Sequence, residues 1–225
     1  MVCEFMLLPH RDGFELDSPL ELLPLPKTPW NGRIAYLDRD GVLNIGSENY
    51  INSPDELVLL PDVANSVAAL RESGFRICVV TNQSPIGRGL WSHENLRDIH
   101  KKLRESLISQ NSNAHLDLIL YSPYAPWEGA WARKPNPGML EAGRQIISAS
   151  ENNLKINLKF DNEYIKSDES TSIMVGDREV DMHAAYNFGV KGIRCDPEIG
   201  ISGVISEILG DRFWQLSIEP EFGLG

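Results

Sequence analysis

The sequence predicts a three-layer α/β fold with a central parallel sheet. Short apolar runs alternate along the chain with longer segments of helical periodicity, and the runs are continuously apolar. Strands buried on both faces have this character, because helices cover each side of a parallel sheet. Each helical segment is then the right-handed crossover between two parallel strands.

The expected elements follow in strict alternation after residue 32. Strands are predicted at 33–38, 75–82, 116–122, 172–177 and 190–195. Helices are predicted at 61–74, 92–109, 137–148 and 178–189. Ser92 is a suitable N-cap for the second helix, and Gly74 is a suitable stop for the first.

Two segments fall outside this alternation. Residues 1–32 contain five prolines and are expected to form an extended N-terminal arm without regular structure. The side chains expected to hold the arm on the body are Leu22, Leu23, Leu25 and Trp30. Residues 33–225 form the main domain, and the polar stretch at about 149–171 is interpreted as a partly mobile surface insertion within it.

The composition limits the classes of function. The chain has 225 residues, of which 42% are hydrophobic, enough for one domain with a substantial core. Its formal net charge of -11 disfavours binding to nucleic acid and to anionic membranes. No apolar run is long enough to span a membrane, and the N-terminus lacks the basic start of a signal peptide. We therefore expect a cytoplasmic monomer that acts on a small molecule.

Polar residues follow several of the predicted strands, where ligands bind to sheets of this kind. Asp38 ends the first strand and Asp40 follows it, Thr81 is next to last in the second, and Asp177 ends the fourth. Close carboxylates need a counter-charge, and Mg²⁺, a hard cation with oxygen ligands, would supply it. The alternative is that each aspartate only ends a strand or caps a helix.

The same residues suit phosphoryl transfer. A carboxylate can attack phosphorus and form an aspartyl-phosphate, and a second carboxylate two residues on can handle the proton. Lys134, Thr81 and the backbone amides after Asp38 would hold the phosphoryl oxygens, because this chemistry depends on positioning and charge neutralisation.

Four segments in order resemble the motifs of the haloacid dehalogenase (HAD) superfamily: "DRDGVLN", "TNQSPIGRG", "RKPNPGM" and "VGDREVDMHAA". The resemblance covers about residues 33–195. It is close to one branch, that of the D-glycero-D-manno-heptose 1,7-bisphosphate 7-phosphatases and the related histidinol-phosphate phosphatases. It implies a Rossmann-like domain, and the short spacing from Asp40 to Thr81 leaves no room for a large cap domain.

The resemblance implies a role for each matching residue. Asp38 would be the nucleophile and a Mg²⁺ ligand, and Asp40 the general acid/base with its backbone carbonyl on the metal. Thr81 and Lys134 would stabilise the phosphoryl group. Asp177 would bind Mg²⁺, and Asp181 would support the metal indirectly or through water.

The substrate contacts implied by the resemblance are less uniform. Asn82, Gln83 and Ser84 would line the pocket with Arg133, and Arg178 is a further candidate. Tyr50 either contacts the substrate or packs against neighbouring side chains. Arg88 either binds a second phosphate or is exposed to solvent. Trp127 and Trp131 either wall the substrate or bury their own loop.

This sequence departs from the branch at two places. Members often carry a zinc loop, but Ser122, Tyr124, Ala130 and Ala132 stand where its ligands would be, so no structural zinc is expected. Pro85 stands where glycine is usual, and proline removes an amide donor.

The expected function is therefore that of a Mg²⁺-dependent phosphoric monoester hydrolase acting on a phosphorylated sugar, with heptose 1,7-bisphosphate as the preferred substrate. A histidinol-phosphate phosphatase is the nearest alternative. A phosphosugar-binding module without catalysis and a nucleic-acid end phosphatase are more distant ones.

Overall fold

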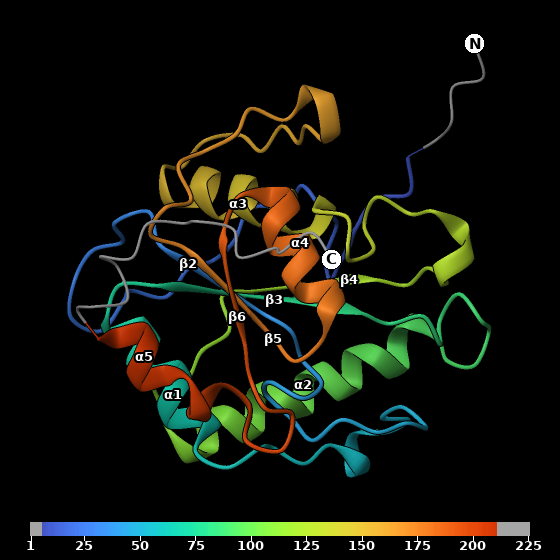
Figure 1. Cartoon of the computed structure of the whole chain (residues 1–225). Coiled ribbons are helices and arrows are strands. Elements are labelled where there is room, and N and C mark those ends of the chain that lie inside the picture. The colour runs from blue at the N-terminus through green and yellow to red at the C-terminus, as the bar shows by residue number, and fades with distance from the viewer. Residues whose placement is uncertain (1–5, 211–225) are drawn as a thin grey trace, which may run out of the picture.

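A six-stranded sheet of order β1-β4-β3-β2-β5-β6 forms the centre of the computed structural model, which describes residues 6–210 (Figure 1). Its strands are β1(His10–Arg11), β2(Ile34–Leu37), β3(Arg76–Asn82), β4(Leu118–Ser122), β5(Ile173–Gly176) and β6(Lys191–Arg194). Neighbours among β2 to β6 are parallel, and β1 is antiparallel to β4. The predicted α/β fold and all five predicted strands are confirmed.

Helices cover both faces of the sheet (Figure 1). They are α1(Val63–Glu72), α2(His93–Gln110), α3(Gly138–Glu151), α4(Glu179–Phe188) and α5(Ile205–Leu209). Helices α1, α2 and α5 lie on one face, and α3 and α4 lie on the other. The four predicted helices are present, and Ser92 caps α2 as expected, accepting the Asn95 amide at 3.2 Å. Short 3-10 turns are η1(Pro54–Glu56), η2(Pro126–Glu128), η3(Asp161–Glu163) and η4(Gly200–Gly203).

Strand β2 shows why the predicted strands are continuously apolar. Ala35 and Leu37 point into the core beneath α1 and α2, whereas Ile34 and Tyr36 point into the core beneath α3 and α4. Successive side chains of a strand face opposite sides of the sheet. Because both sides are covered, every position of the strand must be apolar.

The N-terminal arm is more structured than expected. Residues His10–Arg11 form strand β1 at the edge of the sheet, so the expectation that residues 1–32 lack regular structure is wrong for this part. Trp30 packs on the core beneath α3 and α4, as predicted, together with Leu16 and Leu20. The side chain of Leu23 is 49% exposed and does not hold the arm by packing, but its carbonyl accepts a hydrogen bond from Arg76 Nη1 at 2.6 Å.

The polar insertion is attached to the body by specific contacts. Its first residues continue α3 to Glu151. Further along, Phe160 and Tyr164 pack on the core, and Glu169 forms a buried ion pair with Arg144. The segment is polar because its outer face is solvated, while a few side chains fix its path.

The topology places the functional edge of the sheet. Strand β2 lies between β3 and β5, which is where the direction of winding reverses and where ligands bind in sheets of this type. We call the edge at which β2, β3 and β5 end the carboxyl edge, and the opposite one the amino edge.

Among the described residues between β2 and α1, the helical structure is confined to η1, so the pocket has no large cap there. Within residues 6–210, no helix combines the length and apolarity needed to cross a bilayer.

Candidate active site

A pocket of about 1100 Å³ opens at the carboxyl edge of the sheet. All the predicted catalytic and substrate-contacting residues line it, as does Asp177: Asp38, Asp40, Tyr50, Thr81, Asn82, Gln83, Ser84, Arg133, Lys134, Asp177 and Arg178. Asp181 does not line the pocket, because it is fully buried. The sequence motifs, far apart along the chain, thus meet in one place.

Asp38 sits at the end of β2, held by its backbone. Its amide donates to the Val175 carbonyl at 2.9 Å, which extends the pairing of β2 with β5 by one residue. The Arg39 amide donates to Asp38 Oδ1 at 2.8 Å. The side chain is nearly buried yet borders the pocket, so its carboxylate is fixed in direction and accessible from one side.

Lys134 lines the pocket and forms ion pairs with two of the carboxylates. Its Nζ lies 2.9 Å from Asp38 Oδ1 and 2.6 Å from Asp181 Oδ1. Burial opposes the charge of Lys134, but the two carboxylates outweigh it and raise the pKa of the ammonium. Burial raises the pKa of Asp38 to about 7, with Lys134 acting against this and Asp181 adding to it.

Asp177 completes a cluster of three carboxylates. Asp38, Asp177 and Asp181 each offer an oxygen, and these oxygens lie within 4.8 Å of one another. Burial and the neighbouring Asp181 raise the pKa of Asp177, and its Oδ1 is buried without a hydrogen-bond partner among the described residues. Gly41, at φ +76°, allows this approach, because a β-carbon there would lie 2.7 Å from Asp177 Oδ2.

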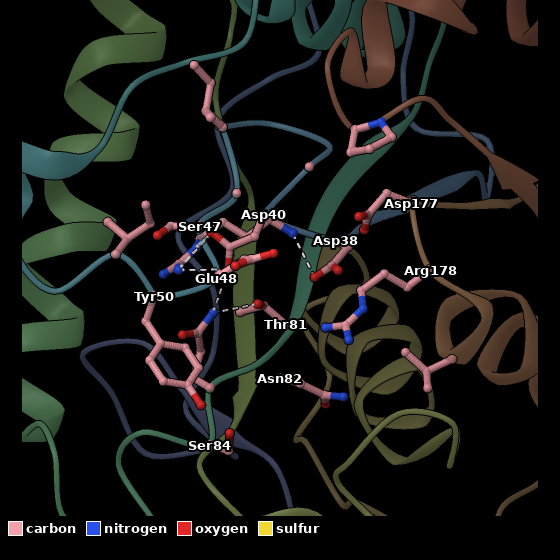
Figure 2. A pocket seen from close by; sticks show the side chains of 18 of the residues that line it. Asp38, Asp40, Ser47, Glu48, Tyr50, Thr81, Asn82, Ser84, Asp177 and Arg178 are labelled. Atoms are coloured by element: carbon pink, nitrogen blue, oxygen red, sulfur yellow. Dashed lines mark hydrogen bonds and ion pairs between the residues drawn. The ribbon is translucent and has the colours of Figure 1, made fainter.

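Asp40 lies beside the cluster but its carboxylate points elsewhere (Figure 2). It accepts hydrogen bonds from the Arg39 guanidinium at 2.9, 3.0 and 3.2 Å and from Asn44 Nδ2 at 2.9 Å. Burial would raise its pKa, but Arg39, Asn44 and Gln83 together lower it. Any role of Asp40 at a metal would thus fall to its backbone carbonyl.

The residues at the end of β3 and just after it connect these groups. Gln83 Nε2 donates to Thr81 Oγ1 at 2.8 Å and to Asp40 Oδ2 at 3.3 Å. Asn82 exchanges two hydrogen bonds of 3.1 Å with the backbone of Lys134. Asn82 therefore fixes the loop that presents Lys134, which is a positioning contact in addition to its place on the pocket wall.

The mouth of the pocket carries aromatic and basic side chains. Tyr50 packs edge-on against Trp91, with ring centroids 5.9 Å apart, and adopts a left-handed backbone at φ 65°. Such a conformation is uncommon for a bulky residue and marks a constrained position. Arg178 lies across the pocket from Tyr50 in Figure 2.

The ambiguous tryptophans have different environments. Trp127 is 73% exposed and lies under the guanidinium of Arg88, 5.0 Å from its ring centre. Trp131 donates its indole N–H to Glu141 at 2.7 Å and packs against Gly138, so it buries its own loop. Neither tryptophan lines the pocket, whereas Arg88 does.

Some residues of the site have partners that the sequence did not reveal. Arg39 and Asn44 served only as markers of the motif "DRDGVLN", yet both hold Asp40. Arg39 also meets the buried His100 of α2, with 3.5 Å between Nη1 and Nε2. The available signal was a histidine on the apolar face of a predicted helix, four residues after Leu96 and three before Leu103.

The chain is similar to known proteins in sequence and in structure. A family model described as HAD-hydrolase-like matches residues 131–195. The chain is 34% identical to D-glycero-beta-D-manno-heptose-1,7-bisphosphate 7-phosphatase of Pseudomonas aeruginosa, covering 79% of this chain and 85% of that protein. It is 35% identical to D-glycero-D-manno-heptose-1,7-bisphosphate 7-phosphatase of Thermosynechococcus vestitus, covering 71% and 76%.

A solved structure is also similar. D,D-heptose 1,7-bisphosphate phosphatase from B. bronchiseptica, complexed with magnesium and phosphate, aligns with a TM-score of 0.58 and 26% identity. The alignment covers 78% of this chain and 99% of that one.

Proposed function

Because the chain belongs to the haloacid dehalogenase-like phosphatase family, we propose that it hydrolyses D-glycero-D-manno-heptose 1,7-bisphosphate at the 7-phosphate with the help of Mg²⁺. The observation that carries the proposal is the set of three carboxylates and one lysine at the carboxyl edge. A phosphatase of this family is a phosphoric monoester hydrolase.

Asp38 is the nucleophile in this proposal. Its carboxylate borders the pocket, and a hydrogen bond from the Arg39 amide and the ion pair with Lys134 direct one of its oxygens. An oxygen of Asp38 attacks phosphorus, the bond from phosphorus to the sugar oxygen breaks, and an aspartyl-phosphate forms. Lys134 and the Thr81 hydroxyl stabilise the phosphoryl oxygens as charge moves across them.

Asp40 handles the proton. It donates one to the departing sugar oxygen and, in the second half of the reaction, accepts one from the water that hydrolyses the aspartyl-phosphate. The arginine beside it lowers its pKa, so the resting group is ionised and must first bind a proton to act as an acid. Arg39, Asn44 and Gln83 fix the direction of its carboxylate.

The residues present suit a divalent cation. Three carboxylates face one ammonium, and Asp177 Oδ1 is buried without a partner among the described residues, a combination that favours a hard cation. Asp38, Asp177 and the backbone carbonyl of Asp40 would hold Mg²⁺, with Asp181 supporting them indirectly. When bound, Mg²⁺ neutralises the carboxylates and the phosphoryl oxygens during transfer.

The pocket wall supports a bisphosphate substrate. Besides the catalytic groups, it carries Arg88, Arg133 and Arg178, which suit a second anionic group at a distance from the first. Glu48 and Glu198 also line the pocket and are the feature that favours histidinol phosphate, whose amine would seek a carboxylate. The three arginines favour the bisphosphate.

The proposal extends to the setting of the enzyme. We expect a cytoplasmic monomer without a nucleic-acid or membrane partner, in keeping with the net charge of -11. We also expect no structural zinc, because Ser122, Tyr124, Ala130 and Ala132 stand at the ligand positions and offer neither thiolate nor imidazole. Hydrogen bonds to backbone carbonyls hold the loop from Ser122 to Lys134 instead. The Arg133 guanidinium donates to the Tyr124 carbonyl at 3.0 Å, and the Ala132 amide donates to the Leu7 carbonyl at 3.0 Å. Metal analysis of the purified protein tests directly whether it contains zinc.

The test is phosphate release from a panel of phosphorylated compounds with Mg²⁺, and with EDTA as the control. The panel contains both anomers of heptose 1,7-bisphosphate, fructose 1,6-bisphosphate, histidinol phosphate and a 3′-phosphorylated oligonucleotide. We expect a preference of about a hundredfold in kcat/KM for one heptose anomer, which is about 2.7 kcal/mol. A higher kcat/KM for histidinol phosphate would replace the proposal, and no release from any compound would favour a binding module.

A further inference from the structure

The N-terminal arm brings a carboxylate to the back of the active site. Strand β1 pairs with β4, with His10 opposite Tyr121 and Arg11 opposite Leu120. The next residue, Asp12, continues this edge, since its amide donates to the Ile119 carbonyl at 3.1 Å. Its side chain reaches α2, where Asp12 Oδ1 lies 3.0 Å from His100 Nδ1.

His100 connects this carboxylate to Arg39. Its side chain is fully buried, and its Nε2 faces Arg39 Nη1 at 3.5 Å. A guanidinium can only donate, so Nε2 must accept and the ring proton must be on Nδ1, from which it is donated to Asp12. Burial lowers the pKa of His100, with Asp12 acting against this and Arg39 and Arg104 adding to it, which agrees with a neutral ring.

Arg39 connects His100 to Asp40 and fixes the direction of the Asp40 carboxylate. Its side chain is 1% exposed, and its guanidinium donates through Nε and Nη2 to both carboxylate oxygens of Asp40. The remaining donor, Nη1, is the one that meets His100. A long side chain that is free to change rotamer has no single orientation. The Arg39 guanidinium has one, because it is buried and its donors face Asp40 on one side and His100 on the other.

We infer that Asp12 and His100 are positioning residues for the proton-transfer group Asp40, acting through Arg39. The inference rests on the proposed function, because it assigns no role unless Asp40 protonates the leaving group. It gives the N-terminal arm a part in catalysis: the arm supplies the outermost member of the series Asp12, His100, Arg39 and Asp40.

The test uses two substrates that differ in their need for an acid. A sugar alkoxide leaves poorly without a proton, whereas p-nitrophenolate leaves as a stable anion. The parameter is kcat/KM, which reports the steps up to loss of the leaving group. For Asp12→Ala we expect kcat/KM on heptose 1,7-bisphosphate to fall about tenfold or more, and that on p-nitrophenyl phosphate to change less than about twofold. His100→Ala should show the same selective loss.

Two further variants separate positioning from folding. Asp12→Asn keeps an oxygen that accepts the His100 proton, so it should retain most of the sugar-phosphate activity. Arg11→Ala removes the contacts of Arg11 with the Ser18 and Pro19 carbonyls and loosens the same arm without touching His100. As long as the contact of Asp12 with His100 remains, it should not lower kcat/KM selectively on the sugar phosphate.

Equal losses on both substrates for Asp12→Ala, or no loss at all, would overturn the inference while leaving the phosphatase proposal intact. The same holds if Asp12→Asn is as impaired as Asp12→Ala on the sugar phosphate. Failure of the unmodified protein to hydrolyse either substrate would instead overturn the proposed function, and the inference with it.

Discussion

At the amino edge of the sheet a cluster of charged side chains is neutral overall, whereas the carboxylate cluster at the carboxyl edge is not. Asp117, before β4, lies 2.8 Å from both Arg71 and Arg76, and Arg76 also pairs with Glu151 at 2.5 Å. Asp117 Oδ2 further accepts the Ile77 amide at 2.8 Å. Two arginines thus face two carboxylates.

The carboxyl edge has a different balance. Lys134 forms ion pairs with Asp38 and Asp181, whereas Asp177 has no ion pair within 4 Å among the described residues and is influenced by Arg178 from further away. Three carboxylates thus have one ammonium at ion-pair distance. The excess of two matches the charge of a divalent cation. We conclude that the charges at the amino edge stabilise the fold, whereas those at the carboxyl edge bind a ligand.

The largest effect should come from removing the nucleophile. Asp38→Asn keeps the shape of the side chain but cannot form an aspartyl-phosphate, so we expect kcat to fall by about 10⁴-fold or more, worth about 5.5 kcal/mol. Circular dichroism should show an unchanged fold. Turnover that survives the substitution would contradict the assignment of Asp38.

The amino edge should show the opposite behaviour. Asp117→Ala leaves two buried guanidinium groups without their shared partner, and we expect the free energy of unfolding to fall by about 3–5 kcal/mol. The kcat of the folded protein should not change. Denaturant titration measures the first effect and steady-state kinetics the second.

The exposed pair of Lys159 and Glu163 is a matched control for that substitution. Glu163→Gln should leave the denaturation midpoint unchanged, because exposed ion pairs contribute little. A stability loss for Asp117→Ala no larger than that of the control would show that the amino-edge charges do not hold the fold.

The unbalanced edge should make stability depend on pH and metal. Asp38 has a folded-state pKa of about 7, above the value of about 4 in an unfolded chain, and the pKa of Asp177 is also raised. The metal-free folded state therefore holds a proton more tightly than the unfolded state. The contribution of this bound proton to the free energy of unfolding is complete below about pH 4 and is lost as the pH rises through about 7. The change is on the order of 2–4 kcal/mol.

Melting temperatures between pH 4.5 and 8, in EDTA and in Mg²⁺, measure this. Mg²⁺ should stabilise the protein more at pH 8 than at pH 5, because it competes with protons for the same oxygens. Asp38→Asn should flatten the pH dependence in EDTA. A metal-free protein whose pH dependence matches that of Asp38→Asn would refute this account of Asp38.

The smallest effect concerns the support of Lys134. Asn82→Ala removes two hydrogen bonds to the Lys134 backbone, and we expect kcat/KM to fall by about tenfold, or about 1–2 kcal/mol. Asn136→Ala removes one amide contact to the Ala130 carbonyl in the same loop and serves as the control. Similar kinetics for both variants would mean that Asn82 does not position Lys134.

Much of the fold and site was predictable, since local sequence encodes both. Strand β2 is apolar on both faces and is followed directly by Asp38, so one short segment specifies a buried strand and a group at the carboxyl edge. The order of such segments then brings Asp177 and Lys134 to the same edge.

The contacts that escaped prediction join distant parts of the chain. Asp12 and His100 are 88 residues apart, and neither belongs to a recognisable motif. Strand β1 has two residues in a proline-rich segment, too short to give a period-two pattern. Likewise, Asp40 could be identified as a site residue, but the direction of its carboxylate depends on where the buried Arg39 side chain packs.

The most direct test of the central claim is the rate of phosphate release from heptose 1,7-bisphosphate as a function of free Mg²⁺, for the unmodified protein and for Asp177→Asn. The account predicts release that is abolished by EDTA and restored by Mg²⁺. Asp177→Asn should need at least about tenfold more Mg²⁺, because one carboxylate of the unbalanced cluster is gone. Release that continues in EDTA, or a Mg²⁺ dependence that Asp177→Asn does not alter, would contradict it.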